Sequence, residues 1–244
     1  MSVARALWIL LLAPLLAAAS PAARAGEPIE LRTGDLRLTH WAQKPSGPAV
    51  RWIVSLHGSR GSARTDLGVW LKTLGDRPIG ILCIQWWRGD GDDYLRPPEI
   101  YREIEDAVAR LGIAPGAAVL HGFSRGSANL YAVAAIDAGR GRRLFSHYVA
   151  SSGGVGLDYP PTRAIAAGAY GPRPLAGTRW VTACGGRDEN PERDGCPAMR
   201  RTAGWLREQG ASLADVIEDP NAGHGALQSE ARNAARLYDL LLGR

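Results

Sequence analysis

Short apolar runs alternate with helix-like segments along most of this chain. Strands are expected at residues 50–56, 80–86, 117–121, 144–150, 179–183 and 212–218, and helices at 66–74, 98–111, 127–138, 197–209 and 226–242. An earlier run, 29–41, also alternates in the manner of a strand. Strands that alternate with helices form right-handed crossovers. The sequence therefore predicts an α/β fold: a mostly parallel, twisted sheet with helices on both faces and functional residues at the carboxyl ends of its strands.

The amino-terminal residues have the layout of a cleaved secretory signal. Arg5 precedes an apolar run at residues 6–19, and Ala23-Arg24-Ala25 is a small-x-small cleavage site. The run is shorter than the ~20 apolar residues that a membrane span needs, so no stable membrane insertion is expected. We expect a signal peptide at residues 1–25 and a single domain at 26–244. Residues 153–178, rich in proline, glycine and alanine, are expected to form a long loop or at most a small cap.

Charge and cysteine content limit the compartment and the partners. The formal charge is +5, but the arginines are scattered among acidic residues and do not form the basic tract typical of nucleic-acid binding. Of the three cysteines, Cys184 and Cys196 can pair in an oxidising compartment, which leaves Cys83 as a buried thiol. Their spacing does not match a zinc site, and we expect no metal or cofactor. The expected location is secreted or periplasmic, and the expected state is a monomer.

Ser124 lies between a predicted strand and a predicted helix, in the motif G-x-S-x-G at residues 122–126. Alone this motif is weak in a chain with 30 glycines. The strand–turn–helix context gives it meaning, because a nucleophilic serine of this type sits on a strained turn with backbone packed closely around it. We interpret Ser124 as the nucleophile.

A serine hydroxyl needs a base, and that base needs an orienting carboxylate. His224 follows the last predicted strand, whereas His121 and His147 lie within strands and are expected to be packing residues. Asp188 follows the preceding strand, and the chain order Ser124, Asp188, His224 is that of strand-borne serine triads. Glu189 and Asp194 are alternatives to Asp188 in the same polar loop.

Two further groups of residues complete the predicted site. Backbone N–H groups of Ser59 and Arg125 are expected to form an oxyanion hole, with Arg60 as an alternative to Ser59 and with His57 in a structural role. Aromatic side chains after the strand at 80–86 are expected to hold an acyl or aromatic group of the substrate; these are Trp86, Trp87 and Tyr94. One of the two tryptophans packing under the loop is an equally acceptable interpretation. The acids Asp90, Asp92 and Asp93 are more typical of a solvated turn than of a cation site.

Together, H-G-x-x-G at residues 57–61, G-x-S-x-G at 122–126, Asp188 and His224 resemble the α/β-hydrolase superfamily. Within it the chain is similar to the secreted esterases of the feruloyl-esterase and polyhydroxyalkanoate-depolymerase-like branch, although Ser127 stands where many relatives have a second glycine. The resemblance implies a secreted serine hydrolase that cleaves carboxylic esters of small molecules or polymers through an acyl-enzyme. The alternatives are a peptidase, amidase or thioesterase with the same triad, and a non-catalytic binding protein on a hydrolase scaffold.

Overall fold

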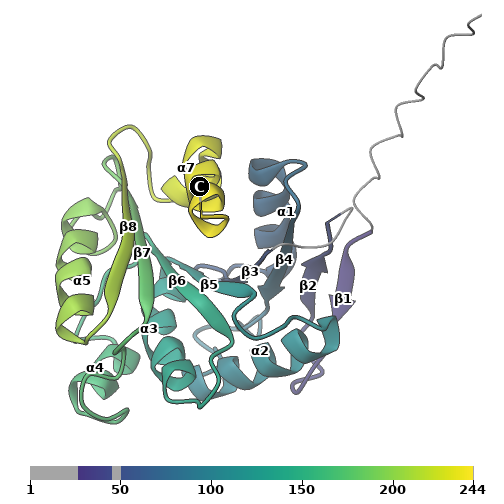
Figure 1. The fold of residues 1–244 in the computed structure, drawn as a ribbon, viewed down its shortest axis with the longest axis horizontal. Coiled ribbons are helices and arrows are strands. Elements are labelled where there is room, and N and C mark those ends of the chain that lie inside the picture. The colour runs from purple at the N-terminus through teal and green to yellow at the C-terminus, as the bar shows by residue number, and fades with distance from the viewer. Residues whose placement is uncertain (1–26, 46–50, 244) are drawn as a thin grey trace, which may run out of the picture.

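A twisted eight-stranded sheet runs through the molecule in the computed structural model, which describes residues 27–45 and 51–243 (Figure 1). Its strand order is β1-β2-β4-β3-β5-β6-β7-β8. The six strands from β4 to β8 are parallel, and β2 and β1 add an antiparallel edge. The strands span Ile29–Leu31, His40–Gln43, Arg51–Leu56, Ile79–Ile84, Ala118–Phe123, Phe145–Ser151, Arg179–Gly185 and Ser212–Asp219 in the order β1 to β8. The mostly parallel α/β sheet is confirmed.

Helices cover both faces of the sheet (Figure 1). Helix α1 (Ala63–Leu74) and helix α7 (Ala231–Leu241) pack on one face, where Trp70 and Leu237 belong to a shared buried cluster with strand residues. Helices α2 (Pro97–Leu111), α3 (Arg125–Ala138) and α5 (Cys196–Glu208) contribute to the core on the other face. Two short helices, α4 (Pro160–Ala166) and α6 (Ala226–Ser229), lie in connecting segments.

The run at 29–41 is two antiparallel strands rather than the single strand expected. The chain reverses between them, with Leu38 N–H donating to Asp35 O at 2.9 Å. Across the turn the Glu103 carboxylate accepts from the N–H groups of Gly34 and Asp35, at 3.0 and 2.8 Å. A carboxylate 68 residues away in sequence therefore satisfies this turn, which local alternation of apolar residues does not reveal.

Helices α1 and α3 begin three and two residues earlier than expected. Helix α1 starts at Ala63 because the Ser62 hydroxyl caps it by accepting from Thr65 N–H at 3.1 Å. Helix α3 starts at Arg125, directly after Ser124. Within residues 153–178 the only helix is α4, which packs against α3, so the expected small cap is one short helix.

The predicted signal peptide at residues 1–25 lies outside the described residues. Within residues 27–45 and 51–243, no helix combines the length and apolar character needed to cross a bilayer.

Candidate active site

Ser124 occupies a strained turn between β5 and α3. Its φ of 54° and ψ of −119° place a non-glycine residue in a region that side chains rarely adopt. A Cβ atom at Gly122 would lie 2.6 Å from Gly126 O, and one at Gly126 would lie 2.2 Å from Leu56 O. Both glycines of the motif are therefore required for this close packing. The turn places Ser124 at the amino end of α3, where the helix dipole favours developing negative charge.

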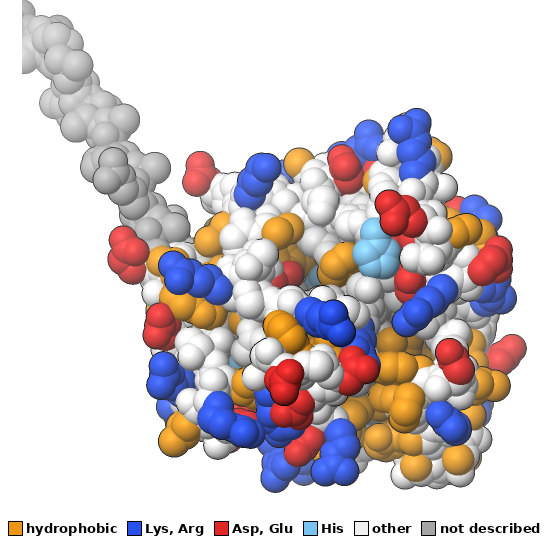
Figure 2. Space-filling view, turned by 180° about the vertical axis from the view of Figure 1, so that it is seen from behind, with side chains coloured by type: hydrophobic (Ala, Val, Ile, Leu, Met, Phe, Trp, Pro, Cys, Tyr) orange, Lys and Arg blue, Asp and Glu red, His pale blue; other side chains and the backbone are white. Residues whose placement is uncertain are grey.

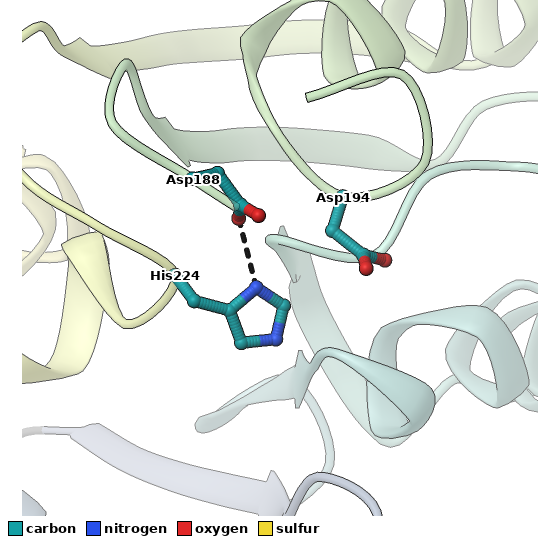
Figure 3. Close-up of side chains that lie close together, drawn as sticks. All are labelled: Asp188, Asp194 and His224. Atoms are coloured by element: carbon teal, nitrogen blue, oxygen red, sulfur yellow. Dashed lines mark hydrogen bonds and ion pairs between the residues drawn. The ribbon is translucent and has the colours of Figure 1, made fainter. Parts of the chain in front are cut away.

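His224 and Asp188 form the second part of the site (Figure 3). Because a carboxylate only accepts, His224 Nδ1–H donates to Asp188 Oδ2, at 2.8 Å. The other oxygen, Asp188 Oδ1, accepts from Asn190 N–H at 2.9 Å, so both oxygens are held. The Asp188 side chain is 1% exposed, whereas that of His224 is 37% exposed. This arrangement fixes the tautomer that leaves Nε2 free to accept a proton.

The two alternative carboxylates behave differently. Glu189 is exposed to solvent. Asp194 lies near the same imidazole, beside Asp188 (Figure 3), and burial raises the pKa of its carboxyl. Ligand atoms of Asp188, Asp194 and His224 lie within 4.8 Å of one another, a spacing that would also admit a metal ion. Among these three residues, the hydrogen bond joins His224 to Asp188, which has the geometry expected of a base and its orienting carboxylate.

Backbone contacts hold the Asp188 loop against the His224 loop. Arg187 N–H donates to Ala222 O at 2.9 Å, and Gly186 N–H donates to Asp219 O at 2.8 Å. The loops come so close at Gly185 that a Cβ atom there would lie 2.1 Å from Gly223 O. The expected Cys184–Cys196 disulfide is confirmed and closes the loop that carries Asp188, while Cys83 is a buried free thiol as expected.

Ser124 and His224 line the same cavity, which measures about 390 Å³. Figure 2 shows one broadly exposed histidine side chain, bordered by acidic and hydrophobic side chains, on the face turned away from the viewer of Figure 1. The His224 side chain is partly exposed, and the other four histidines are buried. The described contacts include no hydrogen bond between Ser124 Oγ and His224. The fold thus brings the predicted nucleophile and the predicted base into the wall of one cavity.

The structure favours Ser59 over Arg60 as an oxyanion donor. Arg60 N–H donates to the Tyr94 hydroxyl at 2.8 Å, so it is already engaged. Ser59 lies beside Ser124 and Arg125 in the wall of a second cavity, of about 330 Å³. Arg125 N–H belongs to the first turn of α3, where backbone donors have no partner within the helix. His57 has the expected internal position, stacked on Trp86 with 5.4 Å between ring centroids.

The aromatic loop only partly fits its predicted role. Trp86 is fully buried and donates through Nε1 to His57 O at 3.1 Å, so the prediction that it contacts substrate is wrong: it supports the turn that carries Ser59. Trp87 lines a neighbouring surface groove rather than either cavity beside Ser124. Tyr94 is half-buried, and the Arg125 guanidinium lies 4.1 Å from its ring centroid.

Arg125 connects two segments at the rim of the site, a role that the motif did not reveal. Its Nη1 donates to Asp92 Oδ1 at 2.9 Å, and its Nε donates to the Tyr159 hydroxyl at 3.4 Å. Asp92 belongs to the acidic string considered above, and it forms an ion pair rather than facing only solvent. Tyr159 precedes α4 and lines the second cavity, and no local pattern around it indicates a site.

No family model and no curated protein matches this chain. Solved structures do. A protein from Thermus thermophilus is 20% identical with a TM-score of 0.64, over 90% of this chain and 100% of its own. A carboxylesterase from Mesorhizobium loti is 17% identical with a TM-score of 0.63, over 88% and 99%. An acylaminoacyl peptidase from Pyrococcus horikoshii is 14% identical with a TM-score of 0.61, over 90% of this chain and 41% of the peptidase. These likenesses show the α/β-hydrolase fold.

Proposed function

We propose that this protein is a serine hydrolase that cleaves carboxylic esters through Ser124, His224 and Asp188. The observation that carries the proposal is the 2.8 Å hydrogen bond from His224 to Asp188. His224 lines the same cavity as Ser124, which lies on a strained turn. Esterases among the structures of the same fold support the choice of ester substrates.

The reaction assigned to these residues has two halves. Ser124 Oγ attacks the ester carbonyl while His224 Nε2 takes its proton, and the Asp188 carboxylate stabilises the imidazolium. Ser59 and Arg125 N–H groups stabilise the oxyanion. The imidazolium then returns the proton to the leaving alcohol, which departs from the acyl-enzyme. A water molecule, deprotonated by His224, hydrolyses that ester and releases the acid.

Labelling with a fluorophosphonate probe tests the nucleophile. Wild type should label, Ser124→Ala should not, and Ser212→Ala should label like wild type because Ser212 is an exposed residue at the start of β8. Matched esters and anilides of one acid then separate esterase from amidase activity, with faster turnover of the ester expected. Folded wild type that fails to label would contradict the proposal and favour a binding protein on this scaffold.

We also propose that the chain is exported and acts as a monomer on a small or polymer-derived ester. The signal-like residues 1–25 and the Cys184–Cys196 disulfide support export. Amino-terminal sequencing of the expressed protein should find Gly26 first, and an intact Met1 would contradict the proposal.

A further inference from the structure

A surface groove of about 530 Å³ adjoins the cavity that Ser124 and His224 line. The cavity and the groove share part of their walls, at Gly61, Ser62 and Thr65. Residues from three segments, 37–41, 60–65 and 85–89, form the groove. A substrate that leaves the catalytic cavity on this side therefore crosses into the groove.

The groove is lined by arginines and by no acidic residue. The arginines are Arg37, Arg60, Arg64 and Arg88. Two of them are already paired, because Arg37 and Arg88 reach the Asp35 carboxylate at 2.7 and 3.2 Å. The arginines that are scattered along the sequence thus gather here on one surface beside the catalytic cavity.

Arg60 and Arg64 supply charge that the protein does not neutralise. Both are exposed, and neither has an ion-pair partner among the described residues. Arg125 and, to a smaller extent, Arg60 lower the pKa of the Asp92 carboxyl, but the ion pair of Asp92, at 2.9 Å, is with Arg125. An anion in the groove can therefore pair with two arginines without displacing a carboxylate of the protein.

Aromatic side chains and a strained turn complete the groove. Trp41 and Trp87 both line it, and the Arg64 guanidinium lies 4.9 Å from the centroid of the Trp41 ring. Arg60 has a positive φ of 52°, and its N–H donates to the Tyr94 hydroxyl at 2.8 Å. Surrounding contacts have to hold a non-glycine residue in that conformation. Flat aromatic faces beside arginines suit a ring that carries an anionic group.

The position of His224 identifies the half of the substrate that reaches the groove, given the proposed function. His224 must protonate the leaving oxygen, so the alcohol half lies on its side of Ser124. His224 lines the cavity that adjoins the groove and does not line the second cavity, which Arg125 and Tyr159 border. The alcohol half is therefore the part that extends past Gly61 into the groove.

We propose that this groove binds an anionic group on the alcohol half of the substrate, and that Arg60 and Arg64 are specificity-determining residues. The substrate class is an ester whose alcohol carries a carboxylate, sulfate or phosphate on a ring remote from the ester oxygen. The planar guanidinium groups match the oxygens of such anions, and the tryptophans contact the ring.

Three butyrate esters of one shape test this inference at pH 7. Their alcohol is 4-(hydroxymethyl)biphenyl with a carboxylate, a carboxamide or an aminomethyl group at the 4′ position, so the remote end is negative, neutral or positive. Each kcat/KM is divided by the rate of hydroxide-catalysed hydrolysis of that ester, which removes differences in intrinsic reactivity. Wild type should prefer the carboxylate to the carboxamide about fivefold, as expected for two partly exposed ion pairs, and the ammonium ester should be the poorest. Salt at ~1 M should reduce the preference.

Variants separate the groove from the positive charge of the whole molecule. Arg60→Gln with Arg64→Gln should abolish the preference for the carboxylate, and Arg64→Gln alone should reduce it by about half. Arg64→Lys should keep most of it. Arg110→Gln is the matched control, because Arg110 is an exposed arginine in the last turn of α2, on the other face of the sheet, and its ratio should equal that of wild type.

The wild-type ratios decide even where a variant fails to fold. Wild type that labels at Ser124 but prefers the carboxamide, or treats all three esters alike, overturns this inference alone. A preference that survives in the double variant and falls in Arg110→Gln also overturns it, because net charge would then be the cause. Absence of labelling overturns the proposed function and this inference with it.

Discussion

Two carboxylates, those of Asp188 and Asp194, lie beside the His224 imidazole (Figure 3). Only Asp188 accepts a hydrogen bond from Nδ1, and its second oxygen is fixed by Asn190 N–H. Asp194 contributes negative charge without such a bond, and burial raises the pKa of its carboxyl. We therefore expect Asp188 to orient the imidazole, and Asp194 to affect it only through its negative charge.

Exchange of each carboxylate for its amide should therefore have unequal effects. Asp188→Asn should lower kcat for an ester by about 10³–10⁴-fold, because an amide in place of the carboxylate favours the wrong tautomer of His224. Asp194→Asn should change kcat less than about tenfold. Steady-state kinetics on one ester measures both, with circular dichroism to show that each variant folds. A larger loss for Asp194→Asn than for Asp188→Asn would reverse the assignment.

Sequence order predicted the pairing of Asp188 with His224, because each follows a strand whose carboxyl end lies at the same edge of the sheet. It could not predict Asp66 or Tyr159 in the cavity walls. Asp66 lies on a helix among ordinary helical residues, and Tyr159 precedes a short helix that proline introduces. Their positions depend on how helices pack against strands distant in sequence, and that packing leaves no local pattern.

The loop that joins β7 to α5 carries Asp188 and is closed by the Cys184–Cys196 disulfide. Cys184 lies near the end of β7, and Cys196 is the first residue of α5. A crosslink over 12 residues stabilises the folded state by ~3 kcal/mol through the entropy of the unfolded chain. It also anchors both ends of the segment that positions the carboxylate.

Removal of the crosslink should weaken both stability and catalysis. Cys184→Ala with Cys196→Ala should lower the free energy of unfolding by ~3 kcal/mol and reduce kcat more than it raises KM, because Asp188 becomes less well placed. Urea unfolding and ester kinetics measure the two effects. Reductant should weaken wild type but leave the double variant unchanged, which separates the disulfide from the buried thiol of Cys83. Equal urea midpoints for both proteins would contradict the prediction.

The order of the major helices and strands was predictable from the periodicity of apolar residues. The conformations of two segments were not, because they depend on contacts with residues far away in the sequence. The early run became two strands around a turn that Glu103 satisfies. The aromatic loop placed Trp86 inward, where its Nε1–H could reach His57 O. In both cases a polar group from another element determines the local conformation. The pattern of hydrophobic residues does not indicate which group that is.

Buried histidines link the stability of the whole molecule to pH. Burial lowers the pKa of His57 and His147 to about 4 and that of His121 to about 3, and it also lowers the pKa of His40. In the unfolded chain a histidine titrates near pH ~6.5. Between these values the unfolded chain binds more protons than the folded one, so the histidines stabilise the fold above pH ~6.5 and lose that contribution as the pH falls toward 4.

Asp66 acts in the opposite sense. Because burial raises the pKa of its carboxyl to about 6, the folded state binds a proton that the unfolded state has released, and acidification from pH 7 toward 4 adds stability. Asp194, whose pKa burial also raises, acts in the same sense as Asp66, and the four histidines outweigh these two carboxyls. The free energy of unfolding should therefore fall between pH 7 and pH 5, by at most ~1.4 kcal/mol per pH unit for each histidine.

Two variants test the sign of the histidine and carboxyl contributions to stability, and the test measures unfolding rather than enzymatic activity. His147→Gln removes a histidine near the start of β6, at the end of the strand opposite to Ser151 and the catalytic site, and should make the decline shallower. Asp66→Asn removes the opposing group, so it should raise stability at pH 7 and make the decline steeper. Urea unfolding at half-unit steps from pH 7 to pH 5 measures all three slopes. Parallel profiles for the three proteins would show that these buried groups do not set the acid sensitivity of the fold.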